Sequence, residues 1–142
     1  MAYGKELILD LYNCDVSKFN RRELRAYFEG LCKVIDMQQC KLTFWDDKWT
    51  WLWKLIYFWN KTIQVADEPH TKGTSAVQFI LTSNITIHTL EKLKECYINI
   101  FSCKDFDVNK TIEFTRIWFQ KLGAVPIQLD YKIVIRGKES KV

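Results

Sequence analysis

Histidine is scarce in this sequence of 142 residues, which contains two, and none of its five cysteines belongs to a Cys-x-x-Cys pair. The usual spacing of zinc ligands is therefore missing, and we expect no bound metal. The odd number of cysteines and the lack of a signal peptide favour free thiols in a reducing cytoplasm. No apolar run is long enough to cross a bilayer, because Lys48 and Lys54 interrupt the Trp-rich segment.

The sequence also lacks a concentrated block of one charge. Its 21 Lys and Arg residues outnumber its 17 Asp and Glu residues, for a net charge of +4, but they are spread along the chain. A nucleic-acid interface needs a basic patch, so we expect no nucleic-acid partner. Apolar residues make up 48% of the sequence and charged residues 27%, which is typical of a soluble globular protein. No repeat or linker is present, and we expect residues 1–142 to form a single domain.

The first half of the chain predicts a strand and then a helix. Apolar and polar residues alternate over residues 7–12, which indicates a β-strand. Asn20 is a suitable N-cap with Glu23 three residues later, and helical spacing follows, so residues 20–37 are predicted to form an amphipathic helix. Residues 49–59 are apolar on every face. The alternation of their tryptophans favours a strand, although a buried helix fits as well.

The second half is rich in β-forming residues. A second helix is predicted to begin at Asp107 or Asn109 and to end at Gly123 as its C′ residue, with Leu122 in its apolar set. Residues 127–135 alternate cleanly, which predicts a final strand with one face in solvent. Further strands are predicted at 41–45, 75–81, 84–88 and 97–103, with a tight connection between the second and third of these.

Strands dominate this pattern and helices come singly. The expected fold class is therefore α+β, a two-layer sandwich with a largely antiparallel sheet and helices packed on one face.

Three short patterns in these strands carry the chemistry. They are Gly73-Thr74-Ser75, the run Ser83-Asn84-Ile85-Thr86-Ile87-His88-Thr89, and Phe101-Ser102-Cys103. Together they resemble the core of the bacterial and archaeal S-adenosylmethionine decarboxylases, in which a Gly-x-Ser strand precedes a Ser-x-Ile-x-Ile-His-Thr strand and a strand ending in Phe-x-Cys. Residues 10–14 and 136–137 resemble the first and last strands of that family. Residues 45–65 look like an insertion relative to its compact members.

The resemblance implies a self-cleaving proenzyme. Ser83 would attack the carbonyl of Thr82, and elimination would cut the chain into residues 1–82 and 83–142. The new end at Ser83 would become a pyruvoyl group, the cofactor, which forms a Schiff base with the substrate's α-amine and accepts electrons when carbon dioxide leaves. The implied substrate is the small molecule S-adenosylmethionine, and the product serves spermidine synthesis.

The remaining matched residues suit this scheme. His88 is the candidate base that removes the α-hydrogen of Ser83, and the hydroxyl of Ser75 is the candidate donor to the oxyanion of the acyl shift. Cys103 is the candidate proton donor to the decarboxylated carbon, provided that burial keeps its thiol protonated. Taken singly, these residues have simpler explanations as turn, strand and core residues. Their joint occurrence at matching spacings favours the catalytic interpretation.

One position departs from the family pattern, because Thr82 stands where the family usually has Glu before the cleaved serine. The attack is on the backbone carbonyl, so this exchange does not forbid the shift, although it affects the rate or the substrate pocket. Two alternatives stay open: the same chemistry on ornithine or arginine, and a catalytically silent homologue that regulates an active partner.

The spacing of Ser83 and His88 predicts a shared site. Five strand residues span roughly 16 Å, and opposite parity points the two side chains to opposite faces of a strand. Ser75 and His88, by contrast, fall nearly opposite each other if the turn lies at residues 81–83. We therefore expect a homodimer with shared active sites, in which one chain's Ser75 and His88 act on the other chain's Ser83 and Cys103.

Overall fold

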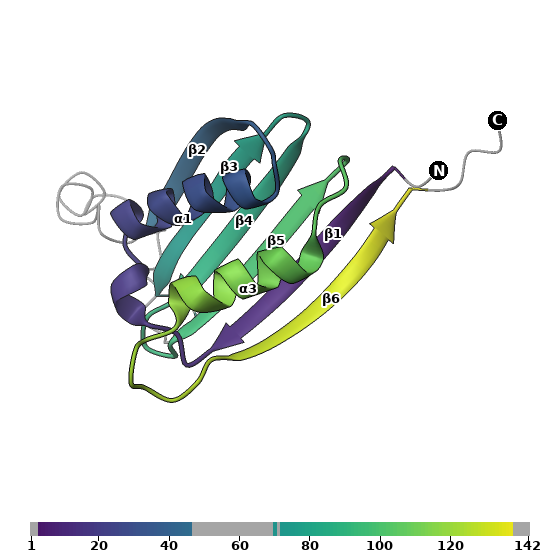
Figure 1. The fold of residues 1–142 in the computed structure, drawn as a ribbon. Helices are drawn as coiled ribbons and strands as arrows, with labels where there is room; N and C mark the ends of the chain where they lie inside the picture. The colour runs from purple at the N-terminus through teal and green to yellow at the C-terminus, as the bar shows by residue number, and fades with distance from the viewer. Residues whose placement is uncertain (1–2, 47–69, 71, 138–142) are drawn as a thin grey trace, which may run out of the picture.

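The computed structural model describes residues 3–46, 70 and 72–137, and shows a six-stranded sheet with two α-helices across one face (Figure 1). The strands lie in the order β2-β3-β4-β5-β1-β6, and every neighbouring pair is antiparallel. This is the predicted α+β two-layer sandwich. The predicted segment 49–59 lies outside the described residues. In chain order the elements are β1 (Gly4–Tyr12), the 3-10 helix η1 (Val16–Lys18), α1 (Arg21–Val34), β2 (Gln39–Asp46), β3 (Gly73–Ile80), β4 (Ser83–Leu90), β5 (Glu95–Ser102), α3 (Val108–Phe119) and β6 (Gln128–Arg136).

Both helices begin at side-chain caps that the sequence indicated. The Asn20 side chain accepts a hydrogen bond from the backbone N–H of Glu23 at 3.0 Å, so α1 starts where predicted. Of the two candidates for the second helix, Asp107 is the N-cap, and its carboxylate accepts from the N–H of Lys110 at 3.0 Å. Each cap satisfies an N–H that has no partner within its helix.

The predicted end of the second helix is wrong. α3 ends at Phe119, and Gly123 lies in the loop beyond it, with φ +72°. Gln120 ends the helix because its backbone is extended, and its side-chain oxygen accepts from the N–H of Ile127 at 2.8 Å. Leu122 is therefore outside the helix and 96% exposed.

The core lies between the helices and one face of the sheet. Leu7, Leu9 and Leu11 are fully buried, as the alternation along β1 predicted. They meet buried side chains of both helices, among which Tyr27 packs against the ring of Phe119 at 5.0 Å between centroids. Burying this apolar area is the main favourable contribution to folding.

The final strand forms where predicted, but the expected burial of one of its faces is wrong. Tyr131, Ile133 and Ile135 are 57%, 43% and 62% exposed. Their register partners include the buried Leu7 and Leu9, so they belong to the helix-side face. Figure 1 shows the reason, since β6 is the edge strand and runs along the outer side of α3.

The β3–β4 hairpin positions the residues of interest. Its turn consists of Leu81 and Thr82, and the register runs without a break from Ile80 opposite Ser83 to Gly73 opposite Leu90. At Gly73 the backbone of β4 comes so close that any Cβ would collide with the carbonyl oxygen of Thr89. Glycine is thus required where β3 begins, and the predicted tight connection is confirmed.

Candidate functional site

The residues singled out in the sequence form two separate groups on this hairpin. Ser75 and His88 lie near the open end of the hairpin, on the sheet face without helices. Ser83 and Cys103 lie at the turn end, next to Thr82.

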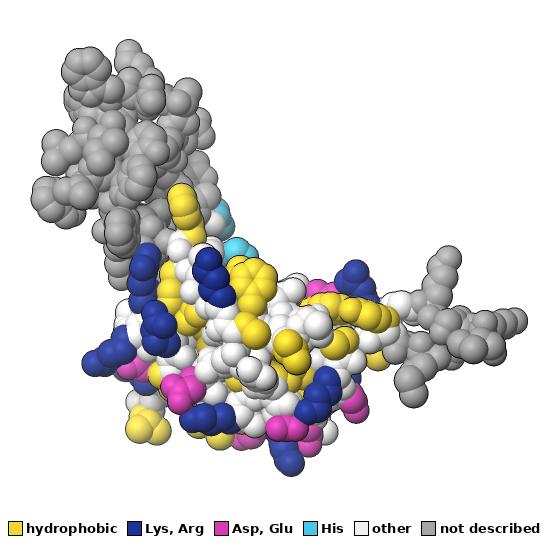
Figure 2. Space-filling view, turned by 90° about the horizontal axis from the view of Figure 1, so that it is seen from above, with side chains coloured by type: hydrophobic (Ala, Val, Ile, Leu, Met, Phe, Trp, Pro, Cys, Tyr) yellow, Lys and Arg dark blue, Asp and Glu magenta, His cyan; other side chains and the backbone are white. Residues whose placement is uncertain are grey.

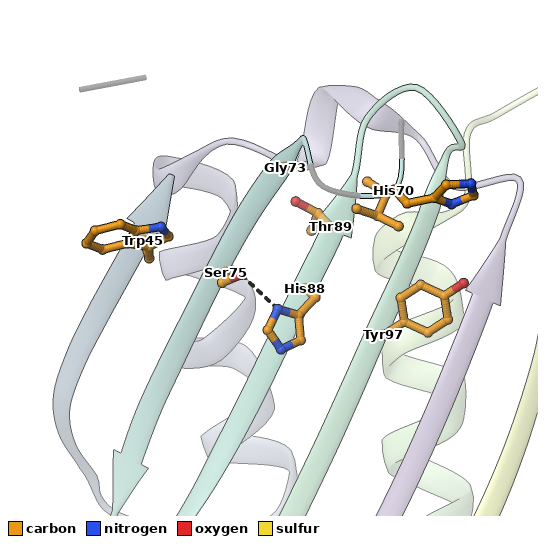
Figure 3. A pocket seen from close by; sticks show the side chains of 8 residues that line it. Trp45, His70, Gly73, Ser75, His88, Thr89 and Tyr97 are labelled. Atoms are coloured by element: carbon orange, nitrogen blue, oxygen red, sulfur yellow. Dashed lines mark hydrogen bonds between the residues drawn. The ribbon is translucent and has the colours of Figure 1, made fainter. Parts of the chain in front are cut away.

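Ser75 and His88 form a hydroxyl–imidazole pair. They are direct partners across β3 and β4, and Ser75 Oγ lies 2.7 Å from His88 Nδ1. Figure 3 shows the two side chains pointing toward each other on the open face of the sheet. Such a pair can pass a proton in either direction, depending on which ring nitrogen carries the hydrogen.

The pair lines a cavity of about 350 Å³ on the open face. Trp45 is the register partner of Ser75, and Tyr97 is that of His88, so an aromatic residue flanks the pair on each side (Figure 3). No sequence motif indicated a role for Trp45, Tyr97 or His70, which also lines the cavity. Strand register brings Trp45 and Tyr97 to the pair, and no sequence motif records that register.

Trp45, Ser75, His88 and Tyr97 form one row across neighbouring strands, and this row continues with two carboxylates. Tyr97 pairs with Asp10, which pairs in turn with Asp130 on β6. Tyr97 also donates a hydrogen bond to Glu95 at 2.7 Å, and this bond, with partial burial, raises the pKa of Tyr97 to about 12. Along this row the open face therefore has an aromatic end at β2 and an acidic end at β1 and β6, whereas farther along β6 the same face carries Lys132 and Arg136.

Elsewhere the charges are mixed. Figure 2 shows Lys and Arg side chains dispersed over the visible surface, with Asp and Glu side chains between them. Among the residues that the structure describes, no three His, Cys, Asp or Glu side chains are grouped closely enough to hold a metal ion. Over the same ranges, no helix has the length and apolar character needed to span a bilayer.

Ser83 sits at the turn end with its hydroxyl held by Cys103. The backbone N–H of Cys103 donates to Ser83 Oγ at 3.1 Å, and the Ser83 hydroxyl donates to Cys103 Sγ at 3.7 Å. Ser83 is 7% exposed and continues the alternation of the buried Ile85 and Ile87, so it lies on the helix side of β4. Its position next to the Thr82 carbonyl follows from the chain itself.

The expectation that burial keeps the Cys103 thiol protonated is wrong. Cys103 follows the last residue of β5 and is exposed, because the strand has already left the core. Hydrogen bonding with the hydroxyls of Thr82, at 3.0 Å from Sγ, and of Ser83 lowers the pKa of the thiol. The Thr82 hydroxyl has a single hydrogen, and Leu81 O lies 2.7 Å from its oxygen. The hydroxyl therefore donates either to Leu81 O or to Cys103 Sγ, and not to both at once.

The two groups do not meet within one chain. Ser83 and His88 are five residues apart on β4, which corresponds to roughly 16 Å. They also face opposite sides of the sheet, and the unbroken register leaves no bulge that would turn one toward the other. The predicted pairing of Ser75 with His88 is confirmed as a matter of geometry, and so is their separation from Ser83.

Comparison with known proteins identifies the family and a similar fold. The model of the S-adenosylmethionine decarboxylase family matches residues 5–124. A crystal structure of the adenosylmethionine decarboxylase from Aquifex aeolicus VF5 superimposes with a TM-score of 0.67, over 99% of this chain and 96% of that one. Its sequence identity is 16%, so this likeness shows the fold alone. No curated protein matches the sequence. The chain belongs to the S-adenosylmethionine decarboxylase family.

The first prediction concerns the Cys103 thiol in a Ser83→Ala chain, which keeps the Thr82 hydroxyl. Alkylation requires the thiolate, so its rate rises with pH and reaches half its maximum at the pKa of the thiol. A lowered pKa places this midpoint pH below the ordinary cysteine value of about 8.5. Adding Thr82→Val should shift that midpoint upward, because the hydroxyl is lost. Peptide mass spectrometry assigns the reaction to Cys103. An unchanged midpoint would show that the Thr82 hydroxyl donates only to Leu81 O and forms no hydrogen bond with the thiol.

Proposed function

We propose that this chain is a self-cleaving, pyruvoyl-dependent S-adenosylmethionine decarboxylase of spermidine biosynthesis. The observation that carries the proposal is the placement of Ser83 directly after a two-residue turn, with its hydroxyl against Cys103. Membership of the decarboxylase family supports it. The five cysteines are free, which favours a reducing cytoplasm as the compartment.

Cleavage would begin with an acyl shift at Thr82. The Ser83 oxygen bonds to the Thr82 carbonyl carbon, the C–N bond breaks, and the hydroxyl proton ends on the freed nitrogen. A base then removes the α-hydrogen of Ser83, and the Thr82 carboxylate leaves. Water converts the remaining unsaturated residue into a ketone and releases ammonia. In this scheme His88 is the base and Ser75 donates a hydrogen bond to the oxyanion of the shift.

The residues present fit a pyruvoyl group at position 83. The precursor serine carries a hydroxyl that is held by hydrogen bonds, and an exposed thiol lies beside it. A pyruvoyl group supplies a ketone that accepts the electron pair left when carbon dioxide departs.

Cys103 would return a proton to the decarboxylated carbon. In the uncleaved chain the Ser83 hydroxyl is one of the two side-chain donors that lower the pKa of this thiol. Conversion of Ser83 removes that hydroxyl, so the pKa rises toward its ordinary value and the thiol is protonated over a wider pH range. Cleavage itself thus prepares Cys103 to act as an acid.

A second copy of the chain would complete the site. His88 and Ser83 are too far apart within one chain, so the partner's pair must act on Ser83. For the partner's His88 to reach Ser83, the contact must include the turn end of the hairpin, where Phe79 is exposed and Tyr3 stacks on Phe101 with ring centroids 6.2 Å apart; Trp45 adds exposed area on the open face. Each dimer would then contain two shared sites.

The whole chain, residues 1–142, would form one domain that stays together after the cut. β3 ends before the cleaved bond and β4 begins after it, yet the two strands remain paired over eight positions. β1 likewise pairs with β5 and β6 of the second piece. The pieces 1–82 and 83–142 therefore share one sheet and one core.

A different substrate is the second candidate, and the acidic end of the open face favours it. Asp10 and Asp130 lie in the same row as His88, with Glu95 bonded to Tyr97. Carboxylates so placed suit the distal amine of ornithine or the guanidinium of arginine. The aromatic end, with Trp45 and Tyr97, suits an adenine ring and a sulfonium cation. A silent regulatory homologue is the third candidate.

Self-cleavage is the second prediction. Intact mass spectrometry should find fragments 1–82 and 83–142, the latter lighter by one ammonia than the product of plain hydrolysis. Ser83→Ala should remain full length, whereas Ser17→Ala, on the distant η1, should be cleaved like the parent. A full-length parent chain after long incubation would leave only the silent homologue.

The third prediction distinguishes the substrates. Cleaved protein should release carbon dioxide from S-adenosylmethionine at least tenfold faster than from ornithine or arginine, because the aromatic residues flank His88 directly. Asp10→Asn with Asp130→Asn should change the rate with S-adenosylmethionine less than the rate with either basic amino acid. The reverse order of rates would identify a basic amino acid decarboxylase.

The fourth prediction concerns the shared site and uses complementation. Ser83→Ala has no nucleophile but supplies an intact His88, and His88→Ala has the nucleophile but lacks the base. Co-expressed with different tags, they should form mixed dimers in which the His88→Ala chain is cleaved. The matched control replaces the first chain with Ser83→Ala/His88→Ala, which should give no cleavage. Mixed dimers without cleavage would place the whole site within one chain.

A further inference from the structure

Thr82 has a backbone conformation that its side chain disfavours. Its φ is +61°, in the left-handed region. Four non-glycine residues of the described part share a positive φ, and Thr82 is the only β-branched one among them, beside Asn13, Asp36 and Lys94. A β-branched residue there is a steric outlier, because its Cβ substituents crowd the backbone.

The turn type adds to this strain. Favoured two-residue hairpin turns have a positive φ at their first residue, which matches the twist of the strands. Here Leu81, the first residue, has no positive φ, and only Thr82 does. Turns with a positive φ at the second residue prefer Gly or Asn there.

The surroundings hold Thr82 in this conformation. Ile80 and Ser83 close the hairpin on either side of the turn, and Leu81 N–H donates to Gln38 O at 3.4 Å. The Thr82 hydroxyl lies within hydrogen-bond distance of both Leu81 O and Cys103 Sγ, and a bond to either one holds its side chain in place. An unfavourable conformation persists in this way only when its neighbours over-determine it.

We propose that the strain at Thr82 drives the acyl shift at the Thr82–Ser83 bond. The inference rests on the proposed function, since Thr82 supplies the carbonyl that Ser83 attacks. Before the shift, one nitrogen joins the Thr82 carbonyl carbon to the Ser83 α-carbon. After it, the link runs through Ser83 Oγ and Cβ, while the former amide nitrogen carries the transferred proton. The longer link loosens the tight turn, and Thr82 can leave the left-handed region.

The Thr82 hydroxyl offers a competing explanation, because it touches Cys103 and could act through the thiol. Two replacements that both lack the hydroxyl separate these effects. Thr82→Val keeps the β-branch and hence the strain. Thr82→Asn has no β-branch and tolerates a positive φ. Thr82→Gly removes the strain entirely.

The shift itself is measured in a His88→Ala chain, where elimination is blocked and hydroxylamine cuts any ester formed at Ser83. The ester should form about tenfold faster with Thr82→Val than with Thr82→Asn or Thr82→Gly, because strain of this kind is released on the way to the ester. Equal rates, or a faster Thr82→Asn chain, would overturn the role of strain. If the Thr82→Val, Thr82→Asn and Thr82→Gly chains form the ester at equal rates, the proposed function stands and only the role of strain fails.

A second measurement reads the strain without any chemistry. In the Ser83→Ala chain, which cannot shift, Thr82→Asn should raise the Tm about 3–6 °C above that of Thr82→Val. A Tm that is no higher for Thr82→Asn would show that Thr82 is unstrained and would overturn the proposal. If the parent and His88→Ala chains form neither fragments nor ester, the proposed function and this inference fail together.

Discussion

The two-residue turn at Leu81 and Thr82 is the constraint on which the site depends. With so short a connection, β3 and β4 have one possible register, and it runs unbroken along the hairpin. That register places Ser75 against His88 and, through the neighbouring strands, aligns Trp45 and Tyr97 in the same row. A shift of this register by one residue would send every side chain of the shifted strand to the other face of the sheet.

The alternation of faces explains why the molecule has two groups rather than one site. Side chains of β4 with odd numbers enter the core beneath the helices, and those with even numbers reach the open face. Ser83 and His88 differ in parity, so the fold separates the nucleophile from its proposed base. The proposed homodimer overcomes this separation only if the partner's His88 reaches Ser83 at the turn end of the hairpin, because the Ser83 side chain lies on the helix side and a partner on the open face alone would not contact it.

The sequence predicted the structural features that depend on residues close together in the chain. The caps at Asn20 and Asp107, the buried leucines of β1 and the hairpin turn were correct, because each reflects local hydrogen bonding or strict alternation. The errors concern burial and termination. Tyr131 is exposed although its strand alternates, since no helix covers the sheet edge, and α3 stops before Gly123 because Gln120 bonds to the chain beyond. The catalytic roles of Ser75, Ser83, His88 and Cys103 stay predictions.

The sequence by itself determined the fold class and the candidate residues, because hydrophobic period and motif spacing are properties of consecutive positions. Only the tertiary structure decided that Cys103 meets Thr82 and Ser83, and that its pKa is lowered where burial was expected to protect the thiol. The same is true of the aromatic and acidic residues beside His88. Contacts between strands depend on register and on which face a helix covers, and both are settled only when the whole sheet is assembled.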